Sequence, residues 1–229
     1  SWRKVMPALA SAGYHVIAPD QRGYGRTTGW SNDYGADIFS YRVFNLVRDL
    51  ICLLDKLDKS YVEAIIGHDF GAYVAAYASL IRPDIFRAMV LMSAPFSGPP
   101  DRRMASKDTI HEDLAKLGPP RKHYQWYYST VEANQDMHRC SQGVDQFLRA
   151  YFHYKSADWI GNSPFPLTAW TAKQLAKMPR YYIMNLDEDM ATTVAKEMPP
   201  PSDIEANEWL PEHELMIYAE EYERTGFQG

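Results

Sequence analysis

The chain has few cysteines, no excess of positive charge and no long hydrophobic run. Its two cysteines among 229 residues, Cys52 and Cys140, predict free thiols in a reducing compartment rather than a disulfide framework. A formal net charge of −5 argues against a nucleic-acid-binding surface. Because no apolar run reaches the length of a membrane span and the first residues show no signal-peptide pattern, we expect a cytosolic protein without a membrane span.

The first part of the chain alternates apolar strand patterns with helical patterns. Almost uninterrupted apolar runs predict buried strands, and apolar residues at helical spacing predict helices that cover a sheet. The strands are expected over residues 14–20, 61–66 and 86–93, and the helices over 2–11, 41–57 and 70–82. This alternation predicts a parallel α/β sheet with right-handed crossovers.

The pattern changes after residue 96. The later residues are rich in Tyr, Trp, Met, Pro and charge, with a strand-like run only at 181–184. We therefore predict an α/β core over 1–96, a mainly helical lid over 97–221 above the carboxyl edge of the sheet, and the start of a return to the core over 222–229. Both ends of the sequence interrupt this pattern, so we expect a partial chain, truncated at both ends.

The segment Gly67-His68-Asp69-Phe70-Gly71 joins an apolar strand to a helix of small residues. This arrangement predicts a nucleophile elbow with aspartate at the position of the nucleophile. We expect both glycines to be required because a side chain there would clash with the strand or the helix. The helix N-terminus favours an ionised Asp69 by roughly 0.3 to 1 kcal/mol. The alternative is that Asp69 only caps the helix.

An aspartate nucleophile narrows the chemistry. Attack by serine on a saturated carbon would give an ether that water does not readily cleave, whereas a carboxylate gives an ester that water can hydrolyse. The predicted electrophile is therefore an sp3 carbon with a leaving group, as in epoxides and haloalkanes.

Four segments resemble the epoxide hydrolases of the α/β-hydrolase fold. They are GYHVIAPDQRGYGRTTGW, VEAIIGHDFGAYVAAYASLIRPDIFRAMVLMSAPF, RKHYQWYYSTVEANQDM and EHELMIYAEEYERTGFQG. The resemblance implies that Asp69 is the nucleophile and that two lid tyrosines donate hydrogen bonds to the epoxide oxygen. Tyr124 matches the first in a Tyr-Gln-x-Tyr pattern, and Tyr218 matches the second ahead of a Thr-Gly-Phe turn.

Phenols suit this role because ring opening generates an alkoxide that needs a proton. Aromatic residues at helical spacing usually pack in a core, and this is the alternative for both tyrosines. Other lid aromatics are predicted to line a pocket for a small apolar epoxide or to pack the lid. These residues are Trp126, Tyr127, Tyr151 and Tyr154.

The chain departs from the family in two ways. The histidine and acid that complete ester hydrolysis in the family, and its His-Gly-x-Pro loop, have no match here, which leaves the N–H of Phe70 as the oxyanion donor. None of the seven histidines has the spacing of a metal site or a relay, so we expect no metal and no cofactor. We expect poor turnover, and association of this chain with itself through exposed sheet edges.

The sequence thus predicts an epoxide hydrolase that forms a vicinal diol through an aspartyl ester. A haloalkane dehalogenase shares the ester step, but that family places an indole N–H donor after the nucleophile, where this chain has Phe70. A catalytically inactive binding module on the same fold is the third possibility.

Overall fold

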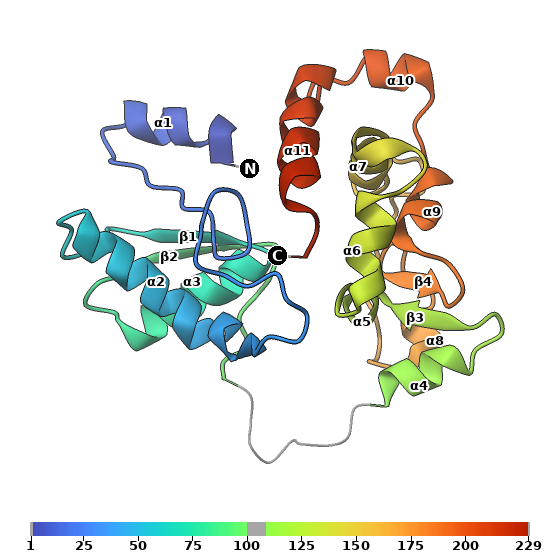
Figure 1. The fold of residues 1–229 in the computed structure, drawn as a ribbon, viewed down its shortest axis with the longest axis horizontal. Helices are drawn as coiled ribbons and strands as arrows, with labels where there is room; N and C mark the ends of the chain where they lie inside the picture. Colours follow the sequence, from blue (N-terminus) through green and yellow to red (C-terminus); the bar gives the residue numbers. More distant parts are fainter. Residues whose placement is uncertain (1, 100–108, 229) are drawn as a thin grey trace. The chain divides into compact units, whose positions relative to one another are not determined.

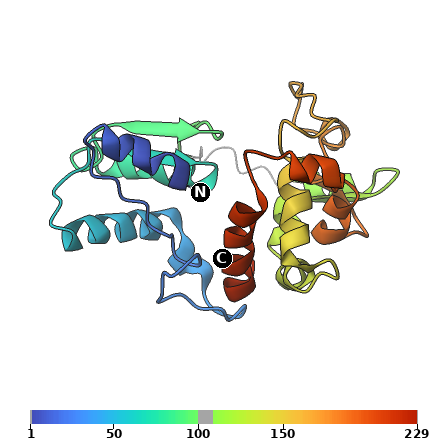
Figure 2. The same cartoon turned by 90° about the horizontal axis from the view of Figure 1, so that it is seen from above.

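The computed structural model describes residues 2–99 and 109–228, which fall into two compact units. The first unit lies within residues 1–105 and the second within 106–229 (Figures 1 and 2). Every helix in the described residues is too short or too polar to cross a membrane.

The first unit is built on a parallel βαβ arrangement. Strand β1 pairs in parallel with β2, with Ile65 opposite Met89 and His68 opposite Met92, and α3 connects them. The elements are η1 (Trp2–Lys4), α1 (Met6–Ser11), η2 (Ile38–Tyr41), α2 (Val43–Lys56), β1 (Ile65–His68), α3 (Phe70–Ile81) and β2 (Met89–Met92). The predicted helices and the parallel pairing of the second and third strands are confirmed.

Helix α3 packs against the strands on one face and against α2 on the other (Figure 1). Its small buried residues, such as Ala72 and Ala76, permit this close approach. Leu46, Val47 and Leu54 of α2 lie in the resulting hydrophobic core. The small-residue helix thus anchors the turn that precedes it.

The predicted strand over residues 14–20 is wrong. These residues form no strand in the described part of the chain, and Tyr14 is 57% exposed. An apolar run indicates a preference for burial, but a strand also needs a neighbour that completes its hydrogen bonds. In the described residues, β1 pairs with β2 and not with residues 14–20. Ile17 of this segment still packs against the core.

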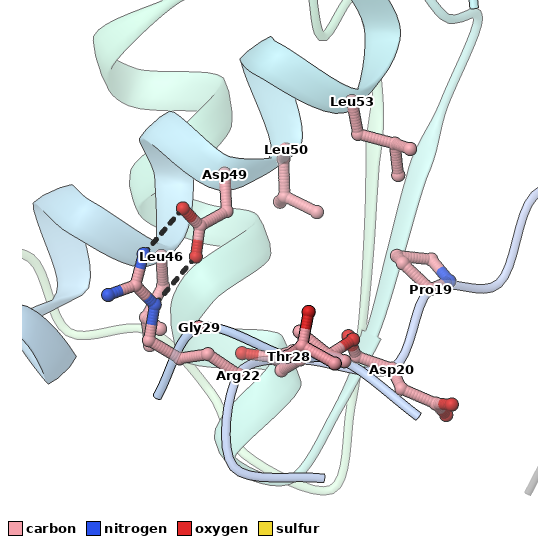
Figure 3. A pocket seen from close by; sticks show the side chains of 11 residues that line it. Pro19, Asp20, Arg22, Thr28, Gly29, Leu46, Asp49, Leu50 and Leu53 are labelled. Atoms are coloured by element: carbon pink, nitrogen blue, oxygen red, sulfur yellow. Dashed lines mark hydrogen bonds and ion pairs between the residues drawn. The ribbon is translucent and has the colours of Figure 1, made fainter. Parts of the chain in front are cut away.

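The loop after residue 20 forms a structural turn that contacts α2. The Arg22 guanidinium donates to both carboxylate oxygens of Asp49, at 2.8 and 2.7 Å. The Asp20 side chain accepts from the N–H of Arg26. A pocket of about 260 Å³ lies between this loop and α2 (Figure 3).

The second unit is mainly helical, as predicted. Its elements are α4 (Ile110–Ala115), β3 (Arg121–His123), α5 (Tyr124–Tyr128), α6 (Val131–His138), α7 (Gly143–Tyr154), α8 (Ala172–Leu175), β4 (Ile183–Asn185), α9 (Met190–Ala195), α10 (Pro201–Glu205) and α11 (Glu212–Thr225). Strand β4 overlaps the predicted strand over 181–184. Its antiparallel partner β3 was not predicted, because Arg-Lys-His has no apolar pattern.

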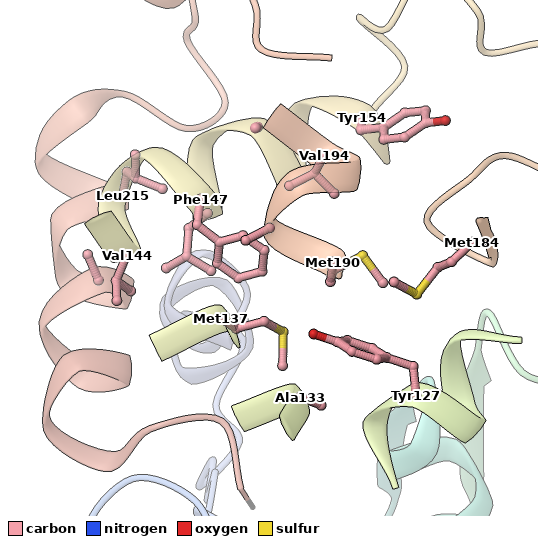
Figure 4. Packing of buried hydrophobic residues seen from close by; sticks show 14 of the residues in the cluster. Tyr127, Ala133, Met137, Val144, Phe147, Tyr154, Met184, Met190, Val194 and Leu215 are labelled. Atoms are coloured by element: carbon pink, nitrogen blue, oxygen red, sulfur yellow. The ribbon is translucent and has the colours of Figure 1, made fainter. Parts of the chain in front are cut away.

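A buried cluster holds α5, α6, α7, α9 and α11 together (Figure 4). Phe147, Met190 and Leu215 are almost completely buried in it. Arg149 of α7 is only 3% exposed and donates to the carbonyl of Leu210 at 2.7 Å and to the carboxylate of Glu212 at 2.8 Å. This buried arginine fixes the start of α11 against α7.

The two glycines of the turn between β1 and α3 differ in the space around them. A Cβ on Gly67 would lie 2.2 Å from the carbonyl oxygen of Gly71 and 2.6 Å from the Cα of Ala72. A Cβ on Gly71 would meet its nearest neighbour, the Gln21 side chain, at 3.9 Å. The expected steric requirement therefore holds for Gly67, and it is wrong for Gly71, because a Cβ on Gly71 would enter open space.

These distances predict opposite effects for two matched substitutions. Gly67→Ala should lower the free energy of unfolding by about 1–3 kcal/mol or more, since backbone atoms must move apart. Gly71→Ala should leave it within about 1 kcal/mol, because alanine favours the helix and meets no obstacle. Denaturant unfolding followed by circular dichroism measures both. Equal losses in the two variants would contradict the account of this turn.

Candidate active site

Asp69 occupies the turn between β1 and α3 in a conformation that L-residues rarely adopt. Its φ and ψ are 53° and −121°. The Asp69 N–H donates to the carbonyl of Met92 at 3.0 Å, and its carbonyl accepts from the N–H of Ala72 at 3.0 Å. A residue held this way typically costs on the order of 1–3 kcal/mol, so it persists only because the neighbouring strand and helix fix it.

The Asp69 side chain is exposed and accepts no hydrogen bond from the first turn of α3. The Asp69 carboxylate therefore does not cap the helix, which was the alternative explanation for this aspartate. The carboxylate stays at the N-terminus of a twelve-residue helix, the end at which the helix dipole is positive. Its oxygens remain available to an electrophile.

Phe70 and Tyr24 are neighbours of Asp69 within the first unit. Phe70 is the first residue of α3, and N–H groups in the first turn have no intrahelical acceptor. The pKa of the Tyr24 phenol is raised, first by burial of the phenol and then by the negative charge of Asp69, although the residue as a whole is 48% exposed. Sequence reasoning missed Tyr24. The loop that follows residue 20 brings it to Asp69, and only the Gly-Tyr-Gly pattern at 23–25 marks it in the sequence.

Tyr124 is held at the junction of β3 and α5 in the second unit. Its N–H donates to the carbonyl of Tyr182 at 2.8 Å. Its ring lies 5.0 Å from the His123 ring, 5.3 Å from Tyr182 and 5.5 Å from Tyr128, measured between centroids. The ring is partly buried at the margin of the main hydrophobic cluster of this unit.

Tyr218 lies on α11 at the margin of the same cluster. Its helical neighbours Leu215 and Ala219 are fully buried, and the Tyr218 ring lies 5.6 Å from that of Phe152 on α7. This face of α11 therefore packs on α7. Both candidate tyrosines border the main hydrophobic cluster of the second unit.

The four other candidate lid residues differ in accessibility. Tyr127 and Tyr154 are buried. The Tyr127 hydroxyl donates to the Asp136 carboxylate at 2.9 Å, and the Tyr154 hydroxyl accepts from the N–H of Arg180 at 3.0 Å. Burial raises the pKa of both phenols. Both residues pack in the core of the second unit.

Trp126 and Tyr151 are more accessible. Trp126 is 49% exposed, and Tyr151 is partly buried. A role for any of the four in lining a substrate pocket stays a prediction. The convergence of Asp69 with Tyr124 and Tyr218 also stays a prediction, because the residues belong to different units. His, Cys, Asp and Glu form no group of three or more in the described residues that could hold a metal ion.

Comparison with known proteins identifies the relatives of this chain. The family model for the alpha/beta hydrolase fold matches residues 1–180. An epoxide hydrolase of Caballeronia sordidicola is 47% identical over 96 residues, which cover 42% of this chain and 27% of that protein. Epoxide hydrolase B of Mycobacterium tuberculosis is 36% identical over 137 residues, which cover 58% of this chain and 37% of that protein. The aligned segments thus cover well under half the length of these relatives.

Solved structures agree with this relationship. An epoxide hydrolase from an endophytic Streptomyces superposes with a TM-score of 0.72 at 27% identity, covering 99% of this chain and 58% of that one. Epoxide hydrolase A of Mycobacterium thermoresistibile superposes with a TM-score of 0.67 at 28% identity, covering 99% of this chain and 60% of that one. Since the family match includes most of the sequence, the chain belongs to the α/β-hydrolase-fold family.

Proposed function

We propose that this chain is part of an epoxide hydrolase in which Asp69 forms a covalent ester with the substrate. The observation that supports this most is the uncapped, exposed carboxylate at a strained turn before α3. The names of the relatives agree with it.

The proposed reaction has two steps. A carboxylate oxygen of Asp69 attacks an epoxide carbon, the carbon–oxygen bond breaks, and its electron pair goes to the ring oxygen. Tyr124 or Tyr218 gives that oxygen a proton, which produces an alcohol and a phenolate. Water then attacks the ester carbonyl and the acyl carbon–oxygen bond breaks, which releases the diol. One proton of the water ends on the departing alkoxide oxygen and the other on the phenolate, so that the carboxylate and the phenol are both restored. The N–H of Phe70 stabilises the oxyanion of this second step.

A haloalkane dehalogenase is less favoured. Halide is a weak base that needs no proton, so two phenols would serve no purpose in its release. The side chain of Phe70 offers no hydrogen-bond donor to a halide. The two tyrosines at the border of one hydrophobic cluster likewise argue against an inactive module. A small apolar epoxide as substrate, self-association and a cytosolic location stay predictions.

Asp69→Asn should abolish formation of the covalent adduct. Incubation of the purified chain with excess styrene oxide should add the mass of one epoxide, and peptide mapping should place it on Asp69. The neutral amide is a far weaker nucleophile, so the variant should show no adduct at this peptide. An adduct of unchanged yield in Asp69→Asn, or an unmodified wild-type chain, would contradict the proposal.

Removal of the phenol hydroxyls should slow the same step. Tyr124→Phe and Tyr218→Phe should each reduce the rate of adduct formation by about tenfold or more, and the double variant by about a hundred- to ten-thousand-fold. Tyr61→Phe in the first unit is the matched control and should react at the wild-type rate. The rates come from quenched samples analysed by mass spectrometry. Wild-type rates in the double variant would remove both tyrosines from the mechanism.

A further inference from the structure

Lys155 caps the C-terminus of helix α7 and lies beside a group of tyrosines. Its ammonium nitrogen lies 3.2 Å from the hydroxyl of Tyr151, to which it donates. The same nitrogen lies 4.9 Å from the centroid of the Tyr151 ring, 5.3 Å from that of Tyr181 and 5.4 Å from that of Tyr182. Such distances allow cation–π attraction to each ring.

This group of tyrosines extends to Tyr124. The hydroxyls of Tyr151 and Tyr128 are 3.3 Å apart, and the Tyr128 ring meets that of Tyr124 edge to face. On the other side, the Tyr182 ring packs against Tyr124 at 5.3 Å. Lys155 therefore contacts Tyr151 and Tyr182, and through them the surroundings of the proposed proton donor.

The ammonium group of Lys155 is surrounded by neutral phenols rather than paired with a carboxylate. In residues 2–99 and 109–228 its ammonium forms no ion pair. Burial alone would lower the pKa of Lys155, but interaction with Tyr151, followed by Tyr182 and Tyr124, outweighs it and raises that pKa. Lys155 is thus a cation at neutral pH. The phenols that contact it are those of Tyr151, Tyr181 and Tyr182, and the Tyr124 phenol lies close enough to interact with its charge.

We propose that Lys155 is a positioning residue for the proposed epoxide opening, in which its charge stabilises the phenolate left on Tyr124 after proton donation. This proposal rests on the proposed function. It assigns Lys155 a role beyond that of a basic residue at a helix C-terminus, where a favourable interaction with the dipole would affect stability alone. Part of the Lys155 side chain is exposed, and water screens its charge accordingly.

The test compares three lysine variants by their rate of adduct formation with styrene oxide as a function of pH. Lys155→Met should slow the reaction by about threefold to thirtyfold and move its phenol-dependent limb to higher pH, since the phenolate loses a neighbouring cation. Lys155→Arg keeps the charge and should restore most of the rate. Lys173→Met, the same change at an exposed position of α8, should match wild type.

A second measurement separates this proposal from the proposed function. Titration of tyrosinate by ultraviolet absorbance needs no substrate, and Lys155→Met should shift the earliest phenol ionisation to higher pH while Lys155→Arg does not. If the wild-type chain forms no adduct, the proposed function fails, and the titration still tests Lys155. Unchanged rate and titration in folded Lys155→Met, or equal losses in Lys155→Arg, would overturn the role. Should Lys155→Met not fold, Tyr151→Phe removes the hydroxyl that holds the ammonium and should shift the titration in the same direction.

Discussion

The backbone of Asp69 is the constraint on which the site depends. A non-glycine residue at φ 53° is held there by its hydrogen bond to Met92 and by the close approach of Gly67 to Gly71. This strain is stored by the packing of α3 between the strands and α2, which the small residues of α3 permit. The fold of the first unit thus holds the Asp69 carboxylate exposed at the start of α3.

The second unit holds several phenols at the edge of a hydrophobic cluster. Tyr124 and Tyr218 come from α5 and α11, far apart in sequence, and both border the cluster centred on α7. Arg149 fixes α11 against α7, and Lys155 caps the C-terminus of α7 beside the rings near Tyr124. Helix α7 is therefore linked to both candidate donors. It packs against α11, which carries Tyr218, and the Lys155 charge at its C-terminus lies near Tyr124.

Local patterns predicted the elements whose formation depends on their own residues. The helical spacing of Phe44, Val47 and Leu54 and the small residues before Pro83 gave α2 and α3 correctly. The run over 14–20 was misread because its apolar character does not reveal whether a partner strand is present. Strand β3, the proximity of Tyr24 to Asp69 and the surroundings of Lys155 all depend on contacts between distant segments, which residue spacing does not encode.

The most direct test is a crystal structure of the chain after reaction with styrene oxide. The account predicts an ester on a carboxylate oxygen of Asp69, with the new alcohol oxygen within hydrogen-bond distance of the hydroxyls of both Tyr124 and Tyr218. An ester on another residue, or an alcohol oxygen distant from both phenols, would contradict it.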